Sequence, residues 1–277
     1  MPDPGVGLAF PNQLKESPAV LGGRLAEIEG WGYDSLWVTD HVVGTRSMRE
    51  VYEPYWLEAL TTLAWVAART SRMRLGTGIL VLPHRDPVLL AKMLVTIDVL
   101  SGGRLDVGVG VGWSRVEFRA LGAERLFEPR GSAGDECLQV LRRCWSGGEI
   151  DFEGEFYAFR HVEFAPRPAQ SPHPPIWVGG QSPAALRRTA RYGDAWHPHD
   201  LEPAALATLA ERLDAEAGRR IPRTVRLDVS GREPAALPEL VAAYGAVGCE
   251  RVVLEFRARP MNEVLTLAER SAEALFR

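Results

Sequence analysis

The sequence predicts an α/β fold, and more specifically an eight-stranded (β/α)8 TIM barrel. Apolar strand patterns alternate with amphipathic helix patterns along the whole chain. Eight such strand–helix units follow one another, and eight is the number of units in a barrel of this kind. The length of 277 residues also fits one barrel, which typically needs about 250 residues. We therefore expect a single domain over residues 1–277, with an open doubly wound sheet as the competing architecture.

The predicted strands are short segments rich in β-branched and apolar residues. They are Val6–Phe10, Ser35–Thr39, Leu75–Val81, Leu105–Gly110, Ile176–Gly179, Ala195–His197, Val225–Val229 and Val252–Phe256. The helices between them carry apolar residues at helical spacing, and several have proline near the first turn, where it is tolerated. They are Ala19–Glu29, Trp56–Ala68, Asp86–Leu100, Arg130–Trp145, Pro183–Tyr192, Pro203–Gly218, Pro234–Val247 and Asn262–Phe276.

Two segments interrupt this alternation. Residues Val42–Tyr55 form a long polar and aromatic loop after the second strand. Residues Glu149–Phe159 alternate polar and apolar side chains around Glu153-Gly154, which predicts a short β-hairpin inserted before the fifth strand. Long insertions on a compact barrel are typical of lids or binding loops.

Composition excludes several classes of function. The net charge of −4 gives no general basic surface, so we expect no nucleic-acid partner. The amino-terminal residues lack the basic and apolar regions of a signal peptide, and no apolar run approaches the ~20 residues of a membrane span. We expect a cytoplasmic protein that does not bind membranes. The three cysteines show no metal-ligand spacing, and we expect no metal site.

One strand–helix–strand unit, residues 74–112, carries glycines at both strand ends. The two strands start about 30 residues apart, which is typical of a right-handed crossover between parallel strands. Glycine lets the backbone approach a ligand closely, and ligands of α/β folds lie at the carboxyl ends of the strands. Gly108, Gly110 and Gly112 alternate with valines, which leaves one face of the strand bare for a ligand or for barrel packing. Their spacing is not that of a dinucleotide fingerprint, and we predict no well-formed helix start after them.

Six segments together resemble the luciferase-like monooxygenase superfamily, and within it the coenzyme F-420-dependent oxidoreductases. They are Ala26–His41, Arg74–Pro83 with Pro87–Lys92, Leu100–Leu105, Gly108–Trp113, Pro174–Gly180 and Ala190–Trp196. The resemblance implies a bacterial luciferase-like barrel with a flavin or deazaflavin at its carboxyl face, and a homodimer. The implied cofactor is coenzyme F-420, with FMN as the alternative.

Asp40 and His41 end the second predicted strand, where side chains reach the barrel mouth. Histidine is suited to proton transfer there because its pKa starts near neutrality. By resemblance, His41 is the catalytic base or acid, and Asp40 orients it or contacts the cofactor. The alternative is an aspartate that caps the loop beside a surface histidine. The family also carries a non-proline cis peptide at the position of Gly78-Ile79, behind the ring of the cofactor.

Gly179, Gly180 and Ser182 precede a predicted helix and form a candidate anion site, since backbone N–H groups and the helix dipole favour negative charge there. We assign the cofactor phosphate to them, with Arg187 or Arg188 as helpers; the alternative is an ordinary helix cap by Ser182. Aromatic residues near the strand ends can wall a pocket that excludes water. The predicted substrate pocket comprises Trp113, Tyr52, Trp56 and His197.

The leading hypothesis is an oxidoreductase that transfers a hydride between F-420 and a small organic substrate. A reduced-FMN monooxygenase and a non-catalytic cofactor-binding barrel are the alternatives. Sugar-phosphate dehydrogenases of the family have a glutamate proton donor where this chain has Trp113. That difference favours a more apolar substrate.

Overall fold

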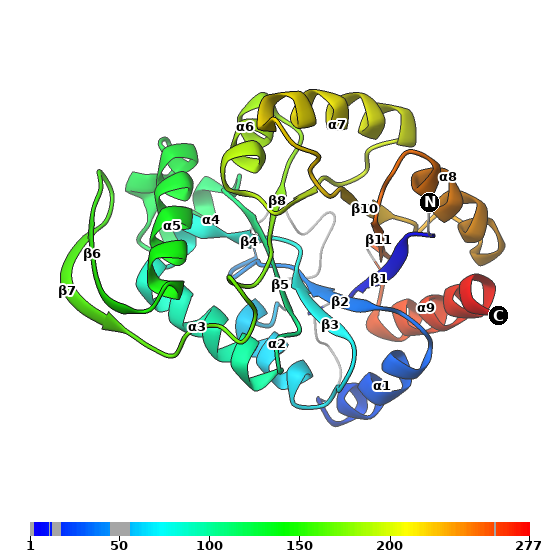
Figure 1. Cartoon of the computed structure of the whole chain (residues 1–277). Coiled ribbons are helices and arrows are strands. Elements are labelled where there is room, and N and C mark those ends of the chain that lie inside the picture. Colours follow the sequence, from blue (N-terminus) through cyan, green and yellow to red (C-terminus); the bar gives the residue numbers. More distant parts are fainter. Residues whose placement is uncertain (1–2, 11, 13–17, 45–55, 258) are drawn as a thin grey trace.

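The computed structural model describes residues 3–10, 12, 18–44, 56–257 and 259–277, and it confirms the predicted barrel. Parallel strands surround a central axis and helices cover their outer side (Figure 1). The strands of the barrel are β1 (Gly5–Ala9), β2 (Ser35–Val38), β3 (Arg74–Thr77), β4 (Leu80–Val81), β5 (Leu105–Gly110), β8 (Ile176–Gly179), β9 (Ala195–His197), β10 (Thr224–Asp228) and β11 (Arg251–Glu255).

The strands pair in the order β10-β11-β1-β2-β3-β5-β8-β9, and β4 also pairs with β5. Segments β3 and β4 are one predicted strand that is interrupted at Gly78-Ile79. Two isolated parallel bridges, Trp196 with Arg223 and His199 with Arg226, link β9 to the region of β10 and nearly close the ring. The open doubly wound sheet is therefore excluded.

The helices agree closely with the predicted ranges. They are α1 (Pro18–Gly30), α2 (Ala59–Ala67), α3 (Pro87–Leu100), α4 (Arg115–Ala120), α5 (Arg130–Trp145), α6 (Pro183–Tyr192), α7 (Pro203–Ala217), α8 (Leu237–Ala246) and α9 (Met261–Phe276). The prediction missed α4, so the expectation that no helix start follows the glycine run was wrong: Ser114 caps α4. No helix in the described ranges is both long and apolar enough to cross a membrane.

The predicted hairpin is present as β6 (Gly148–Glu153) and β7 (Ala158–Phe164), which pair antiparallel. It lies outside α5, away from the barrel axis (Figure 1). The buried carboxylate of Glu136 on α5 accepts the backbone N–H groups of Glu155, Phe156 and Tyr157 in the hairpin turn, at 2.7–2.9 Å for the shortest contact of each. The hairpin is therefore fixed to the side of the barrel and is not a lid.

Tryptophan rings fill the middle of the barrel. Trp37 and Trp177 are buried, with ring centroids 4.8 Å apart. Glycines on neighbouring strands make room for them: a Cβ atom at Gly76 would lie 2.3 Å from the Trp37 ring, and one at Gly7 would lie 2.9 Å from its Nε1. The packing of large side chains against bare backbone therefore explains part of the high glycine content of the strands.

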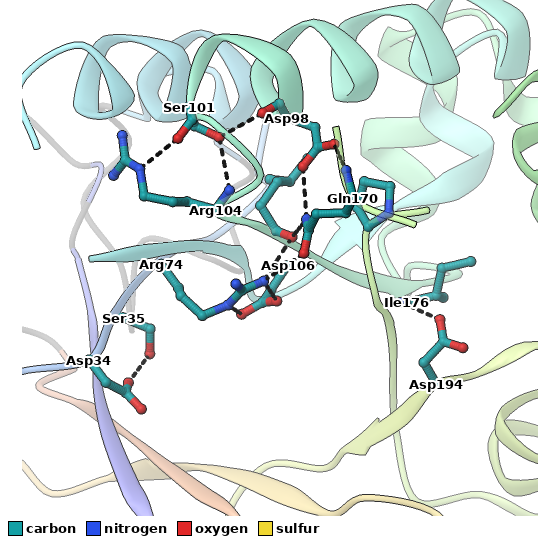
Figure 2. Close-up of polar contacts among 12 residues, drawn as sticks. Asp34, Ser35, Arg74, Asp98, Ser101, Arg104, Asp106, Gln170, Ile176 and Asp194 are labelled. Carbon is teal, nitrogen blue, oxygen red and sulfur yellow. Dashed lines mark hydrogen bonds and ion pairs between the residues drawn. The ribbon is translucent and has the colours of Figure 1, made fainter. Parts of the chain in front are cut away.

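Paired charges occupy the end of the barrel where the strands begin. Arg74 donates from Nε to Asp106 at 2.9 Å, and Arg251 donates from Nη1 to the same carboxylate at 3.2 Å. Figure 2 shows the Arg74–Asp106 pair and, beside it, Asp98 with Gln170, whose Nε2 donates to Asp98 at 2.8 Å. Asp106 and Asp98 are almost wholly buried. These ion pairs and hydrogen bonds close the lower end of the barrel.

Candidate active site

A cavity of about 530 Å³ opens at the other end, where the strands finish. Its walls come from the segments that follow β2, β3, β5, β8 and β9, as expected for an α/β barrel. Most of the predicted site residues line it, and these are Asp40, His41, Gly78, Ile79, Gly110, Gly112, Trp113, Gly179, Gly180 and Ser182. The structure therefore brings these residues together around one cavity.

The peptide bond between Gly78 and Ile79 is cis, as predicted, and it lies in the cavity wall. The Ile79 side chain lies against two of the predicted glycines. A Cβ atom at Gly110 would lie 2.0 Å from Ile79 Cδ1, and one at Gly179 would lie 3.0 Å from Ile79 Cγ2. These glycines therefore serve the packing of Ile79 as well as the cavity surface.

His41 is held by a residue that the sequence analysis missed. Its Nδ1 lies 3.1 Å from Oε2 of Glu117, and the backbone N–H of Val42 donates to Oε1 of the same carboxylate at 3.2 Å. Glu117 is 2% exposed. A carboxylate only accepts hydrogen bonds, so Nδ1 carries the proton and Nε2 of a neutral imidazole does not. The pair fixes both the orientation and the tautomer of His41.

A local sequence signal for Glu117 does exist. Ser114 and Glu117 have the spacing of a capping box, and the Ser114 Oγ accepts the Glu117 backbone N–H at 3.4 Å. The Glu117 carboxylate does not complete the box, because it is bound to His41 and Val42. A six-residue helix has too little periodicity to reveal where this side chain points.

Aromatic rings surround His41. The Trp56 ring centroid lies 4.9 Å from that of His41, and the Trp113 centroid lies 6.2 Å away. Trp113 lines the cavity and is 60% exposed, which places it at the mouth. Trp56 contacts His41 and is not among the residues that line the cavity. Tyr52 lies outside the described residues.

Asp40 was expected to orient His41 or to contact the cofactor, but its hydrogen-bond partners are Arg85 and Val81. Its carboxylate accepts two hydrogen bonds from Arg85, both at 2.7 Å, and the backbone N–H of Val81 at 2.9 Å. Arg85 also donates to Glu58 at 2.7 Å. Burial opposes the charge of Arg85, but its bonds to Asp40 and Glu58 outweigh burial and raise the pKa of the guanidinium. Asp40 therefore connects the end of β2 to β4 and to Arg85, which follows β4, and Glu117 orients His41.

His197 and Gly108 lie inside the barrel and do not line the cavity. His197 Nδ1 is 2.7 Å from Thr224 Oγ1, and that hydroxyl donates to the Trp196 carbonyl at 3.0 Å. Burial, followed by the charges of Arg226 and Arg251, lowers the pKa of His197 to about 3, so the ring stays neutral. A Cβ atom at Gly108 would lie 1.8 Å from the Thr77 carbonyl oxygen. Both residues therefore contribute to packing and hydrogen bonding inside the barrel.

Cationic and dipolar groups meet on one side of the cavity. Gly180 has a positive φ of 100°, and Ser182 caps α6 by accepting the Ala185 N–H at 3.2 Å. The buried Arg188 guanidinium donates to the Gly131 carbonyl at 2.9 Å and pairs with Asp135. Arg130 lines the same cavity, but its guanidinium donates to the Phe127 carbonyl at 2.8 Å. A helix N-terminus together with the Arg188 guanidinium suits an anion such as a phosphate.

No cluster of metal-ligating side chains occurs among the residues that the structure describes. The groups that face the cavity are the histidine–glutamate pair, the aromatic wall and the anion side.

A family model described as luciferase-like monooxygenase matches residues 8–269. An uncharacterised protein of Mycobacterium tuberculosis is 32% identical over 223 residues, covering 79% of this chain and 76% of that protein. An F-420-dependent glucose-6-phosphate dehydrogenase of Kineococcus radiotolerans is 31% identical over 230 residues, covering 79% and 66%. An FMNH2-dependent dimethylsulfone monooxygenase of Pseudomonas putida is 37% identical over 141 residues, covering 50% and 38%.

Two solved structures share the fold. The monooxygenase RslO1 of Streptomyces bottropensis superposes with a TM-score of 0.78 at 23% identity, covering 98% of each chain. An F-420-dependent secondary alcohol dehydrogenase, solved with an F-420–acetone adduct, gives a TM-score of 0.77 at 15% identity and covers 100% of each chain. At these identities the likeness shows the fold alone.

Proposed function

Because the chain belongs to the luciferase-like monooxygenase family, we propose that it is an oxidoreductase that transfers a hydride between coenzyme F-420 and a small organic substrate. The family includes enzymes that use F-420 and enzymes that use FMN. The observation that carries the proposal is the buried Glu117 carboxylate, which fixes the proton of His41 on Nδ1 at the wall of the cavity.

The cavity fits a phosphorylated flavin or deazaflavin. Its wall includes Ile79 and Gly112, which are partly exposed and could contact a flat ring, while Gly78 and Gly110 beside them are buried. The capped start of α6 and the guanidinium group of Arg188 suit a phosphate. When bound, F-420 supplies a two-electron hydride acceptor or donor, and the protein contributes orientation, a dry pocket and proton transfer.

In this proposal His41 moves the proton that accompanies the hydride. When an alcohol is oxidised, its carbon loses a hydride and its hydroxyl loses a proton, which leaves a carbonyl group. The unprotonated Nε2 of His41 accepts that proton, and Glu117 stabilises the resulting imidazolium through Nδ1. In the reverse direction the imidazolium returns the proton to the carbonyl oxygen. Trp113 at the mouth limits the access of water.

A reduced-FMN monooxygenase is the second candidate. It is supported by the dimethylsulfone monooxygenase relative, which has the highest identity among the relatives named above but covers half of this chain. The same cavity, aromatic wall and anion side would serve that cofactor, so the fold does not separate the two functions.

The deciding experiment is a titration of the full chain with F-420 and with FMN, each in oxidised and reduced form. Micromolar or tighter binding of F-420 with much weaker binding of FMN is expected. The reverse preference, together with substrate-dependent oxygen uptake, would replace the proposal by the second candidate. Binding of F-420 without turnover across a panel of alcohols and ketones would support a non-catalytic binding barrel.

A further inference from the structure

We propose that a second cavity, between α5, α6 and α7, binds an anionic chain that continues beyond the cofactor phosphate. This inference rests on the proposed function and concerns which form of the cofactor the protein selects. In F-420 the phosphate is a diester that continues into a lactyl group and a chain of glutamates, whereas FMN ends at its phosphate. A site for that extension would distinguish the two cofactors.

The second cavity adjoins the first at the anion side. Its volume is about 540 Å³, and Gly131, Ala184 and Arg188 line both cavities. Residues at the start of α5 and along α6 form its walls, and Glu216 and Ala217 of α7 form part of the opposite side. A ligand whose phosphate lies at the start of α6 can therefore extend from one cavity into the other without crossing a helix.

The walls of the second cavity offer two cationic side chains in a row. Arg187 and Arg191 are four residues apart on α6, so they lie on the same face of the helix. Within the part of the chain that the structure describes, neither the Arg187 nor the Arg191 side chain forms an ion pair or hydrogen bond, and the Arg191 guanidinium lies 5.0 Å from the centroid of the Tyr192 ring. Both guanidinium groups are thus able to bind carboxylates.

The acidic side chains of the cavity do not cancel these charges. Asp135 is already paired with Arg188, so its charge is compensated within the wall. Glu216 remains on the α7 side. The α6 side is therefore cationic, and a chain of carboxylates would be expected to follow α6 rather than α7.

The distances suit an elongated ligand. From Ser182 to Arg191 the helix advances nine residues, which is roughly 13 Å at 1.5 Å per residue. A phosphate bound at Ser182 and Arg188 leaves Arg187 and Arg191 within reach of groups attached beyond it. A nucleotide that ends at the phosphate does not reach Arg191.

The test compares deazaflavins that differ only in this extension. Dissociation constants are measured on the full chain for F-420 with a long glutamate chain, for F-420 without glutamates, and for the riboflavin-like deazaflavin that has no phosphate. The long form should bind about threefold to tenfold more tightly than the form without glutamates, because exposed ion pairs are individually weak. Raising the salt concentration should reduce that ratio, since it screens exposed charges.

The variants are Arg187→Ala with Arg191→Ala, and Arg270→Ala as the matched control. Arg270 is an exposed arginine on α9, across the barrel from α6 (Figure 1). The double variant should bring the ratio of the two F-420 forms close to one and leave binding of the phosphate-free deazaflavin unchanged. Arg270→Ala should keep the wild-type ratio.

Three outcomes would overturn the inference. They are equal binding of long and short forms by the wild-type protein, an unchanged ratio in the double variant, and an equal loss for the phosphate-free ligand in the double variant. In each case tight binding of F-420 itself would leave the proposed function standing. Preference for FMN over all deazaflavins would instead overturn the proposed function.

Discussion

The two ends of the barrel use charged side chains from the same set of strands in different ways. At the lower end, Arg74 and Arg251 both bind Asp106, so the charges are satisfied by other side chains. At the mouth, Arg226 on β10 donates from Nε to Glu255 at 3.0 Å and also binds the Gly78 carbonyl oxygen. At the lower end, ion pairs link neighbouring strands to one another. At the mouth, a charged side chain binds the backbone that surrounds the cavity.

Arg226 connects the two segments that carry the candidate chemistry. In addition to the Gly78 carbonyl, it donates from Nη2 to Thr39 Oγ1 at 2.9 Å, and Thr39 directly precedes Asp40 and His41. Asp40 makes a second connection from the same strand end to the backbone of Val81. We therefore expect substitutions at the lower end to reduce mainly the stability of the protein, and substitutions at the mouth to reduce mainly cofactor binding and turnover.

The largest effect is expected for His41→Ala, since removal of a proton-transfer group typically costs 10²–10⁴-fold in rate. Turnover of an accepted substrate should fall by about three orders of magnitude, and the dissociation constant of the cofactor should change by less than about threefold. Steady-state kinetics and cofactor titration measure the two quantities. A fully active variant would remove His41 from the mechanism.

Arg251→Met tests the lower end. The substitution leaves Asp106 buried with only Arg74 as its cationic partner, and breaking a buried pair typically costs about 3 kcal/mol or more. Chemical denaturation should show that loss in the free energy of unfolding. Cofactor affinity of the folded variant should match that of the wild type, and a large loss of affinity would mean that the lower end also shapes the cavity.

Glu117→Gln tests the partner of His41. The amide oxygen can still accept the Nδ1 hydrogen bond, while the amide NH2 replaces the oxygen that accepts the Val42 N–H. The variant therefore loses the Val42 hydrogen bond and the negative charge that stabilises the imidazolium. We expect kcat to fall roughly 10–100-fold with little change in KM. A fall in kcat accompanied by an equally large rise in KM would indicate that the substitution disturbs the whole mouth of the barrel.

Arg226→Met is the matched counterpart of Arg251→Met. Loss of the bonds to the Gly78 carbonyl and Thr39 should weaken cofactor binding by about tenfold, which corresponds to roughly 1.4 kcal/mol. Arg226→Lys should recover part of the loss, because one cation can still bind one of the two partners. Unchanged binding in the methionine variant would mean that the mouth keeps its shape without Arg226.

The smallest effect is expected at Glu29, at the lower end. Burial raises its pKa, but the backbone N–H groups of Met73, Arg72 and Ser71 outweigh burial and lower the pKa to about 2. A lowered carboxyl pKa adds stability above the unfolded value near 4.5, and that stability is lost as the pH falls towards 2. Glu29→Gln should therefore slightly lower the melting temperature at pH 7 and flatten its fall between pH 4.5 and 2.

Strand and helix positions were predictable where the local signal was strong. The ranges of α5 and α6 and of β8 agree with the prediction at both ends, helped for α6 by Ser182 followed by proline. The cis peptide at Gly78-Ile79 was predictable only from the resemblance, because a glycine inside a strand has several local explanations.

The missed features depend on contacts between distant segments. His197 ends β9 as predicted, but only the closed barrel shows that its ring stacks on Trp37 inside the core. Glu117 is 76 residues from His41 in the sequence, so their contact follows from the fold. The alternating pattern of residues 149–159 predicts a hairpin, but it does not predict that the hairpin packs beside α5.

The attachment of the hairpin has a practical consequence for handling this protein. The β6–β7 turn projects from the molecule (Figure 1) and is an obvious place to insert a tag or a fluorescent label. Its amide hydrogens are bound to Glu136, and the preceding residue, Asp135, pairs with Arg188 at the edge of the cavity. A reporter inserted in that turn would disturb the contacts of the helix that supports ligand binding, so the turn is a poor position for one.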